Sequence, residues 1–187
     1  MLLRNLVDNY PLGVLSEGQK KALQFIISKL EISSIQSLKQ QAYVIATIYH
    51  ETAFTYLPVK EYGSLKYLMS KPYYPYIGRG FVQITWKENY KRFGDLLKID
   101  LVEKPDLALE SEISWRITEL GMTKGLFTGK KLSDYFDEET DWINARRIIN
   151  KLDKAEIIAD YAKRIYWAID HIEEKDIPLP NPPHTGG

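Results

Sequence analysis

The stretch Ala42–Thr52 constrains the fold more than any other part of the chain. It reads AYVIATIYHET, an apolar run that ends in His50 and Glu51. Apolar residues on nearly every side of a helix are typical of a helix that is buried all round. We therefore predict a central helix that begins after Ser37 and ends at about Glu51, with the rest of the chain packed around it.

The acid at the end of this helix is the first candidate for chemistry. A carboxylate at the C-terminus of a buried helix is partly removed from water and lies near the negative pole of the helix dipole. Both effects favour the neutral form of the group. A carboxyl group that keeps its proton near neutral pH can act as a general acid. Glu51 is therefore our candidate proton donor.

Further helices are predicted around the central one. Capping-box patterns, in which Ser or Asp is followed three residues later by Gln or Glu, begin at Ser16, Ser37 and Asp153. Apolar residues recur at helical spacing after two of these caps and in residues 86–97, 107–124 and 142–149. Residues 177–187 are rich in Pro and Gly and predict an extended or disordered tail. We expect a single domain over residues 1–176.

Residues 54–85 differ in character from the rest of the chain. Prolines and glycines interrupt short segments rich in Tyr and Val, at Pro58, Gly63, Pro72, Pro75, Gly78 and Gly80. Such punctuation is typical of turns and short strands, and three prolines argue against a continuous sheet. We predict a small irregular lobe with a two- or three-stranded sheet, whose strands include Val59–Tyr62 and Phe81–Thr85.

Charge and composition narrow the classes of function. The 187 residues include 25 basic and 25 acidic side chains, and this balance argues against a dedicated nucleic-acid binder. Residues 60–100 hold eight basic and four acidic side chains, which indicates either a solvated face or a surface for an anionic polymer such as a cell wall. No segment approaches the roughly 20 apolar residues of a membrane span, and the N-terminus does not resemble a signal peptide.

No metal or other cofactor is expected. The chain has no cysteine, which excludes disulfides and thiolate metal sites. His50, His171 and His184 show no ligand spacing, and the acids of residues 134–141 lack the pattern of a calcium loop.

Glu61 is the candidate second carboxylate. It follows Glu51 by ten residues and falls in the first predicted strand of the small lobe. Two carboxyl groups on opposite walls of a cleft, one protonated and one ionised, are the minimal apparatus for hydrolysing a glycosidic bond. On spacing alone, an exposed loop acid is the open alternative.

A third group of residues carries a family resemblance. Its motifs are His50-Glu51-Thr52, Gly78-Arg79-Gly80, Gln83-Ile84-Thr85, Asn89-Tyr90 and a C-terminal motif over residues 144–156. They resemble the glycoside hydrolase family 19 chitinases and, more closely, the chitinase-like endolysins of bacteriophages, over about residues 37–172. The resemblance implies a mainly α (α+β) fold of the lysozyme-like superfamily, in which a helical body and a small β-containing lobe flank a substrate cleft.

The resemblance also implies a role for each matching residue. Glu51 matches the general acid, and Thr85 matches a hydroxyl residue that helps to hold the attacking water. The expected substrate-binding residues are Gln83, Asn89, Tyr90, Asn150 and His50. For His50 two interpretations stand, a hydrogen bond that orients Glu51 or a satisfied histidine near the core, whereas Arg79 is expected to be structural.

Glu61 matches the family less closely. Plant chitinases place the second carboxylate farther from the acid, whereas phage lysozyme-like enzymes place it at about this separation, followed by a Thr. The spacing therefore favours the phage pattern. The segment Lys71–Ile77 departs from the short YYGRG of the family, and it either adds aromatic platforms for sugar or packs as a loop.

These features together predict a phage or prophage endolysin, a lysozyme-type N-acetylmuramidase that cleaves the glycan strands of peptidoglycan and lyses the host. Glu51 would protonate the glycosidic oxygen, Glu61 would be the base or electrostatic partner, and Thr85 would hold the water, with inversion implied by the resemblance. We expect a monomer, made in the host cytoplasm, that reaches the wall through another factor such as a holin without entering the membrane itself. A chitinase acting on poly-N-acetylglucosamine and a non-catalytic wall-binding phage module are the alternatives.

Overall fold

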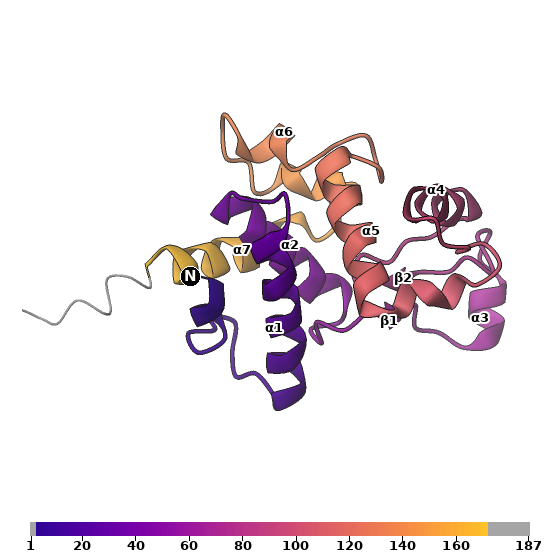
Figure 1. The fold of residues 1–187 in the computed structure, drawn as a ribbon, viewed down its shortest axis with the longest axis horizontal. Helices are drawn as coiled ribbons and strands as arrows, with labels where there is room; N and C mark the ends of the chain where they lie inside the picture. Colours follow the sequence, from indigo (N-terminus) through magenta and orange to yellow (C-terminus); the bar gives the residue numbers. More distant parts are fainter. Residues whose placement is uncertain (1–2, 172–187) are drawn as a thin grey trace, which may run out of the picture.

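A computed structural model describes residues 3–171 and shows a mainly helical fold with one small sheet (Figure 1). The elements in chain order are η1 (Leu3–Leu6), α1 (Glu17–Ile32), α2 (Leu38–Glu51), β1 (Val59–Lys60), α3 (Leu65–Met69), β2 (Arg79–Gly80), α4 (Lys87–Leu97), η2 (Pro105–Leu109), α5 (Ser111–Lys124), α6 (Ser133–Phe136), η3 (Asn144–Ile148) and α7 (Ala155–Asp170). The predicted fold class is confirmed. The predicted tail and the domain boundary at residue 176 lie outside the described residues.

Helix α2 is the centre of the body, as predicted. Every residue from Gln41 to Ile48 is buried, so the helix is enclosed on all sides. Helix α7 packs along it, and these two helices make the most extensive contact between any described elements. Ser37 is the N-cap residue and the helix begins directly after it, as predicted, but the predicted capping box is wrong, because the Ser37 side chain makes no capping hydrogen bond. The Gln40 amide donates instead to Asp137 Oδ1 at 3.0 Å, a partner from the distant α6 region.

The other two predicted caps have opposite outcomes. At Ser16 both hydrogen bonds of the capping box are present, and α1 begins there as predicted. The predicted cap at Asp153 is wrong, since α7 begins after Lys154, which has a left-handed backbone, and no side chain caps the helix. The Asp153 carbonyl is turned toward Arg146 and accepts a hydrogen bond from its Nε at 2.9 Å.

The small lobe contains a two-stranded antiparallel sheet. Val59 pairs with Gly80 and Lys60 with Arg79. The predicted strand at residues 81–85 is wrong: Gln83 has a positive φ of 55°, which turns the chain, and only an isolated bridge joins Ile84 to Arg79. Sheet and α3 therefore form an irregular lobe whose position depends on loops rather than on long strands.

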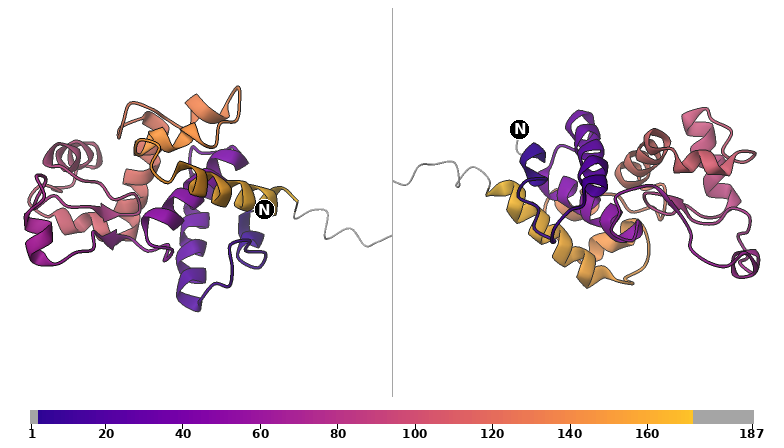
Figure 2. Two further views of the ribbon diagram at one scale, coloured as in Figure 1. Left: turned by 180° about the vertical axis from the view of Figure 1, so that it is seen from behind. Right: turned by 90° about the horizontal axis from the view of Figure 1, so that it is seen from below.

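The body and the lobe lie at opposite ends of the long axis of the molecule. In Figures 1 and 2, α1, α2 and α7 group at one end, while α3, α4 and the sheet group at the other. Helix α5 lies between the two groups, and η2, which directly precedes α5 in the chain, contacts both α5 and β2. Helix α2 ends at Glu51, and the chain then runs directly into the lobe.

Candidate active site

The Glu51 carboxylate ends α2 in an ion pair with a buried arginine. Arg146 Nη1 donates to Glu51 Oε1 at 2.5 Å, and the side chains are only 4% and 16% exposed, respectively. The arginine comes from η3, 95 residues further along the chain. Glu51 is therefore not a lone acid in apolar surroundings, because a fixed positive charge from another part of the fold lies against it.

Polar atoms of α2 continue from this ion pair into the body. Thr47 and Tyr43 lie about one and two turns, respectively, before Glu51 on the same face of the helix, and both are buried. Within the described residues, neither hydroxyl has a hydrogen-bond partner. Burial raises the pKa of Tyr43 above its ordinary value, partly offset by the charge of Arg146. The Arg146–Glu51 pair thus lies close to a neutral, buried phenol.

His50 is half-buried next to Glu51, and its Nδ1 has no hydrogen-bond partner among the described residues. Burial is the main cause that lowers the pKa of His50 below its ordinary value, which favours the neutral ring. Among residues 3–171, no side-chain hydrogen bond joins His50 to Glu51, so the described contacts do not support an orienting role. Its contact with substrate stays a prediction.

Glu61 follows β1 in the lobe and is held by neutral donors. Its Oε1 accepts a hydrogen bond from the Tyr73 hydroxyl at 3.0 Å, and its Oε2 accepts one from the Gly78 backbone N–H at 2.9 Å. Its own N–H donates to the Gly78 carbonyl at 2.8 Å, which continues the pairing of β1 with β2. The half-buried side chain is thus fixed by the loop that precedes β2, not by an ion pair.

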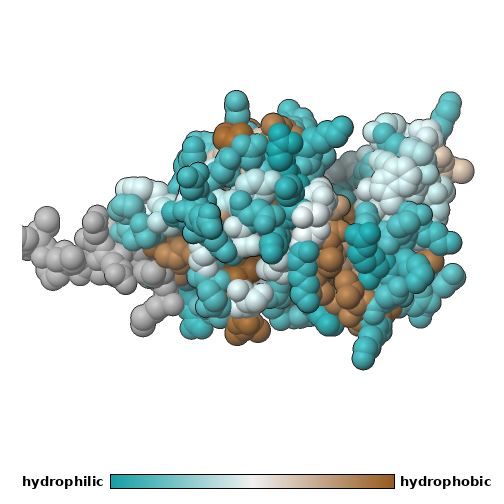
Figure 3. All heavy atoms as spheres, turned by 90° about the horizontal axis from the view of Figure 1, so that it is seen from above, coloured by the Kyte–Doolittle hydropathy of each residue, from teal (hydrophilic) through white to brown (hydrophobic). Residues whose placement is uncertain are grey.

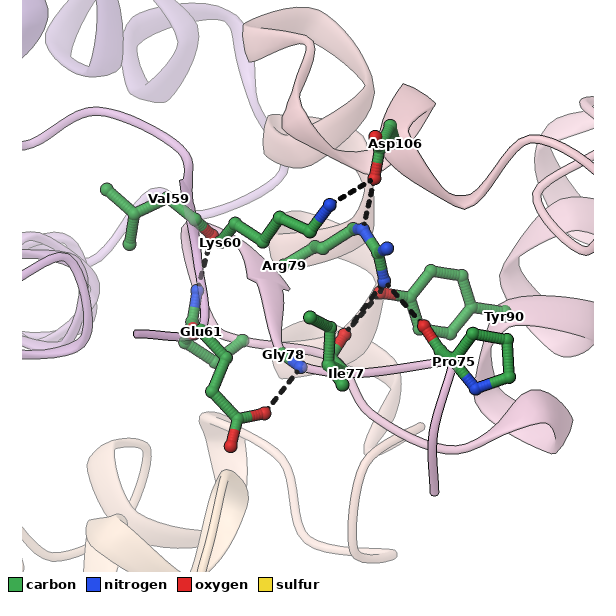
Figure 4. A network of polar contacts seen from close by, with 10 residues as sticks. Val59, Lys60, Glu61, Pro75, Ile77, Gly78, Arg79, Tyr90 and Asp106 are labelled. Carbon is green, nitrogen blue, oxygen red and sulfur yellow. Dashed lines mark hydrogen bonds and ion pairs between the residues drawn. The ribbon is translucent and has the colours of Figure 1, made fainter. Parts of the chain in front are cut away.

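Arg79 organises the interior of the lobe (Figure 4). Its buried guanidinium donates to Asp106 through Nε at 2.6 Å and to the Tyr90 hydroxyl through Nη1 at 3.0 Å. The same Nη1 lies 3.2 Å from the carbonyls of Pro75 and Ile77. Figure 4 shows the Glu61 carboxylate directed away from this network, toward the Gly78 amide. These contacts agree with the expected structural role of Arg79.

Steric contacts explain why a glycine stands on each side of Arg79. A Cβ at Gly78 would lie 2.7 Å from Gln83 Oε1, so this amide side chain could not pack over the strand. Gly80 has a positive φ of 88°, and a Cβ there would lie 2.7 Å from Ser114 Oγ and 2.9 Å from the Ala108 carbonyl. The Gly-Arg-Gly motif therefore fits the sheet against α5 and η2.

The predicted cleft residues around α4 are used mainly for internal contacts. Gln83 donates from Nε2 to the Val59 carbonyl at 2.7 Å and to the Gly80 carbonyl at 3.0 Å. Asn89 donates to the Thr85 carbonyl at 2.8 Å. Tyr90 is fully buried, and its hydroxyl also donates to the Ile77 carbonyl at 2.7 Å. Their sugar contacts stay predictions, as does the role of the half-buried Thr85, since the contacts described for them are internal.

Asn150 is exposed just after η3, and its backbone N–H donates to the Arg146 carbonyl at 3.0 Å. The segment that supplies the partner of Glu51 therefore also carries Asn150. This segment belongs to the C-terminal motif over residues 144–156, but the sequence did not identify Arg146 as a site residue. The available signal was a charged residue directly after Ala145 in a segment predicted to present an apolar face.

A charged hollow elsewhere on the body is separate from these residues. Its volume is about 830 Å³, and it is lined by Lys130, Asp134, Glu138 and Arg147, among others, around α6. Figure 3 views the molecule from the side on which α6 lies and shows that hydrophilic side chains cover most of this face. Among residues 3–171, no group of three His, Asp or Glu side chains is placed to hold a metal ion, and no helix has the length and apolarity to cross a membrane.

Comparison with solved structures identifies the fold. Chitinase C from Streptomyces griseus superimposes with a TM-score of 0.61 at 18% identity, covering 90% of this chain and 75% of that one. A family 19, class IV chitinase from Zea mays gives a TM-score of 0.56 at 16% identity, covering 89% and 90%. A bacterial family 19 chitinase gives 0.56 at 21% identity. The chain therefore has the fold of the family 19 chitinases.

Sequence similarity to curated proteins is local. Endochitinase CH5B of Phaseolus vulgaris is 38% identical over 71 residues, which is 34% of this chain and 22% of that enzyme. Chitinase 11 of Oryza sativa subsp. japonica is 58% identical over 33 residues, 18% of this chain and 13% of that protein. No protein-family model matches the chain. The similarity thus covers a short part of the plant enzymes, whereas the fold similarity covers nearly the whole chain.

Proposed function

We propose that this protein is a glycoside hydrolase that cleaves the glycan strands of bacterial peptidoglycan and serves as a phage endolysin. The observation that carries the proposal is the placement of Glu51. It ends the buried central helix of a family 19 chitinase fold, pairs with a buried arginine, and the chain then enters the lobe that carries a second fixed carboxylate, Glu61.

In the proposed reaction the protonated Glu51 carboxyl transfers its proton to the glycosidic oxygen as the bond from that oxygen to the anomeric carbon breaks. Glu61 accepts a proton from a water molecule, and the water oxygen forms the new bond to the anomeric carbon. Thr85 would help to hold this water. The products are two shorter glycans, one with a new reducing end, and attack from the face opposite the leaving group inverts the anomeric configuration.

Arg146 has a defined part in this scheme. Once the proton has left, the guanidinium stabilises the carboxylate through the charge-assisted hydrogen bond described above. Arg146 thus favours the charge distribution that develops as the bond breaks.

Two features support peptidoglycan as the substrate. The ten-residue separation of Glu51 and Glu61 resembles the phage lysozyme-like pattern more than the plant one. The local basic excess of residues 60–100 would suit an anionic cell wall. In this role the protein would act as a monomer, accumulate in the host cytoplasm and reach the wall after another factor, such as a holin, opens the membrane.

Chitin is the second candidate substrate, and a specific observation favours it. The solved structures and the local sequence matches described above are chitinases. Both polymers contain N-acetylhexosamine units, so the same pair of carboxylates would serve either.

The test compares wild type with Glu51→Gln on purified peptidoglycan and on chitin oligomers. Gln keeps an oxygen that can accept the Arg146 hydrogen bond, so the variant should fold, and its melting temperature provides the check. We expect release of new reducing ends from peptidoglycan to fall by roughly 10²- to 10⁴-fold, as for loss of a general acid. Glu88→Gln, an exposed acid at the start of α4, is the matched control and should keep wild-type activity.

Each outcome has a clear meaning. Near-wild-type activity in Glu51→Gln would remove Glu51 from the mechanism, and cleavage of chitin oligomers alone would replace peptidoglycan by chitin. Wall binding without release of reducing ends would make the protein a non-catalytic wall-binding module. Mass spectrometry of the new sugar ends would identify the bond that is cut, and NMR of fresh products would show whether the configuration is inverted.

A further inference from the structure

The segment Lys71–Ile77 lies directly before the Gly-Arg-Gly motif and departs from the short family sequence at this point. The segment contributes a side chain to the candidate site, because the Tyr73 hydroxyl donates a hydrogen bond to Glu61 Oε1 at 3.0 Å.

This hydrogen bond completes the fixation of the carboxylate. Gly78 N–H already holds Oε2 at 2.9 Å, so the two oxygens have one donor each. A carboxylate that accepts a hydrogen bond from a single donor can still rotate about that hydrogen bond. Two donors on different oxygens fix the plane of the carboxylate. Tyr73 is the only side chain that donates to Glu61 in the part of the chain that the structure describes.

The ring of Tyr73 is itself held in place. It packs edge-to-face against Trp86, with ring centroids 5.5 Å apart and ring planes at 65°. Trp86 has an unusual positive φ of 72°, and its backbone N–H donates to the Tyr76 carbonyl at 3.0 Å. The insert is thus tied at Tyr76 to the start of α4, and the tryptophan ring, 45% exposed, supports the tyrosine.

The surroundings of Tyr73 keep its hydroxyl protonated, so that it can donate a hydrogen bond. Burial, followed by the hydrogen bond to Glu61, raises the pKa of Tyr73 above its ordinary value, so the phenol keeps its proton at neutral pH. Lys71 is the basic group nearby, and its ammonium lies 4.0 Å from the ring centroid of Tyr67 rather than in an ion pair with Glu61.

We propose that Tyr73 is a positioning residue, which orients the Glu61 carboxylate for proton abstraction from the attacking water, and that Trp86 supports it. The inference rests on the proposed function, because it gives Glu61 the role of the base. It assigns a task to the insert that distinguishes this chain from the short family sequence.

The experiment removes one oxygen atom. Tyr73→Phe keeps the ring contact with Trp86 but loses the donor, and Tyr74→Phe makes the same change at the next residue, whose hydroxyl has no hydrogen bond among the described contacts. With purified peptidoglycan as substrate, we expect kcat of Tyr73→Phe to fall about tenfold with KM nearly unchanged, the size of one lost hydrogen bond to a charged group. Tyr74→Phe should match wild type in each measurement.

A second measurement does not depend on activity. In protein labelled with ¹³C at Glu carboxyl carbons, the chemical shift of the Glu61 carboxyl is compared at neutral pH in wild type and both variants. This chemical shift should change only in Tyr73→Phe, because only that variant removes a donor from the carboxylate. An active wild type with unchanged kcat in Tyr73→Phe would overturn the positioning role alone. An inactive wild type would overturn the proposed function and this role together, and an unchanged carboxyl chemical shift would show that the hydrogen bond itself is not made in solution.

Discussion

The two carboxylates of the candidate site are held in opposite ways. Glu51 in the body is fixed by a buried positive charge, Arg146, which comes from 95 residues away. Glu61 in the lobe is fixed by a phenol and a backbone amide that lie 12 and 17 residues away. One residue depends on a long-range ion pair and the other on local turns and neutral donors.

This difference matches the tasks proposed for the two groups. A proton donor must become an anion during the reaction, and a nearby cation stabilises that anion. A base needs to be oriented toward water, and neutral donors do this without a charge that would compete for the carboxylate. The comparison predicts that the body is sensitive to loss of charge, whereas the lobe is sensitive to changes of shape around its glycines.

The largest expected effect on stability is that of Arg146→Met. Removing one partner of a buried pair leaves the other charge without compensation, and we expect the free energy of unfolding to fall by about 3 kcal/mol. Urea denaturation followed by circular dichroism measures this loss. Arg147→Met is the matched control, because Arg147 is exposed and its Nε bonds only Asn144 Oδ1, and a change within about 0.5 kcal/mol is expected.

A double variant tests whether the uncompensated charge causes this loss of stability. In Glu51→Met/Arg146→Met both charges are absent, and much of the stability should return, since a buried pair is often replaceable by apolar side chains. Equal stability of Arg146→Met and Arg147→Met would contradict the view that the body depends on this ion pair.

Gly80→Ala tests the importance of shape in the lobe. The new Cβ would meet Ser114 Oγ and the Ala108 carbonyl, and the backbone has a positive φ, so we expect a loss of about 2 kcal/mol. Gly129→Ala separates the two causes, because Gly129 has a similar φ of 86° but no atom within 4 Å of the added Cβ. Its loss should be about 1 kcal/mol, from backbone strain alone. Equal losses in chemical denaturation would mean that close packing against α5 does not matter.

Asp106→Asn tests charge in the lobe and should have the smallest effect. The hydrogen bond from Arg79, with a contribution from Lys60, holds the pKa of Asp106 below its ordinary value of 3.8. The Asp106 side chain is 65% exposed, so the loss at pH 7 should be about 1 kcal/mol or less. Because the folded-state pKa is depressed, this stabilisation is present above the unfolded-state pKa and disappears as pH falls through the folded-state value.

The measurement is the difference in free energy of unfolding between wild type and Asp106→Asn from pH 7 down to about pH 2. The difference should shrink below about pH 4 as the carboxyl takes up its proton. A difference that stays constant over this range would assign the effect to packing rather than to charge.

The sequence by itself determined the longer helices and the position of the acid. A run that is apolar on all sides requires burial, and α2 lies buried where Ala42–Glu51 predicted it. The complete capping box at Ser16 predicted the start of α1 because both of its hydrogen bonds are local. The Pro- and Gly-rich composition predicted an irregular lobe for the same reason, since backbone limits act residue by residue.

Only the tertiary structure decided which partners these residues have. At Ser37 the capping box is not formed, and the Gln40 side chain bonds Asp137, 97 residues away, instead. At Asp153 no side-chain cap forms either, and the Asp153 carbonyl accepts a hydrogen bond from Arg146 in η3. The predicted strand at residues 81–85 became a turn, in which the Gln83 side chain joins the carbonyls of both strands. The pairing of Glu51 with Arg146 could not be predicted from spacing, because it exists only once η3 has folded back against the end of α2. Periodicity and capping are local properties of the chain, whereas the partner of a charged side chain depends on which distant segment the packed core places beside it.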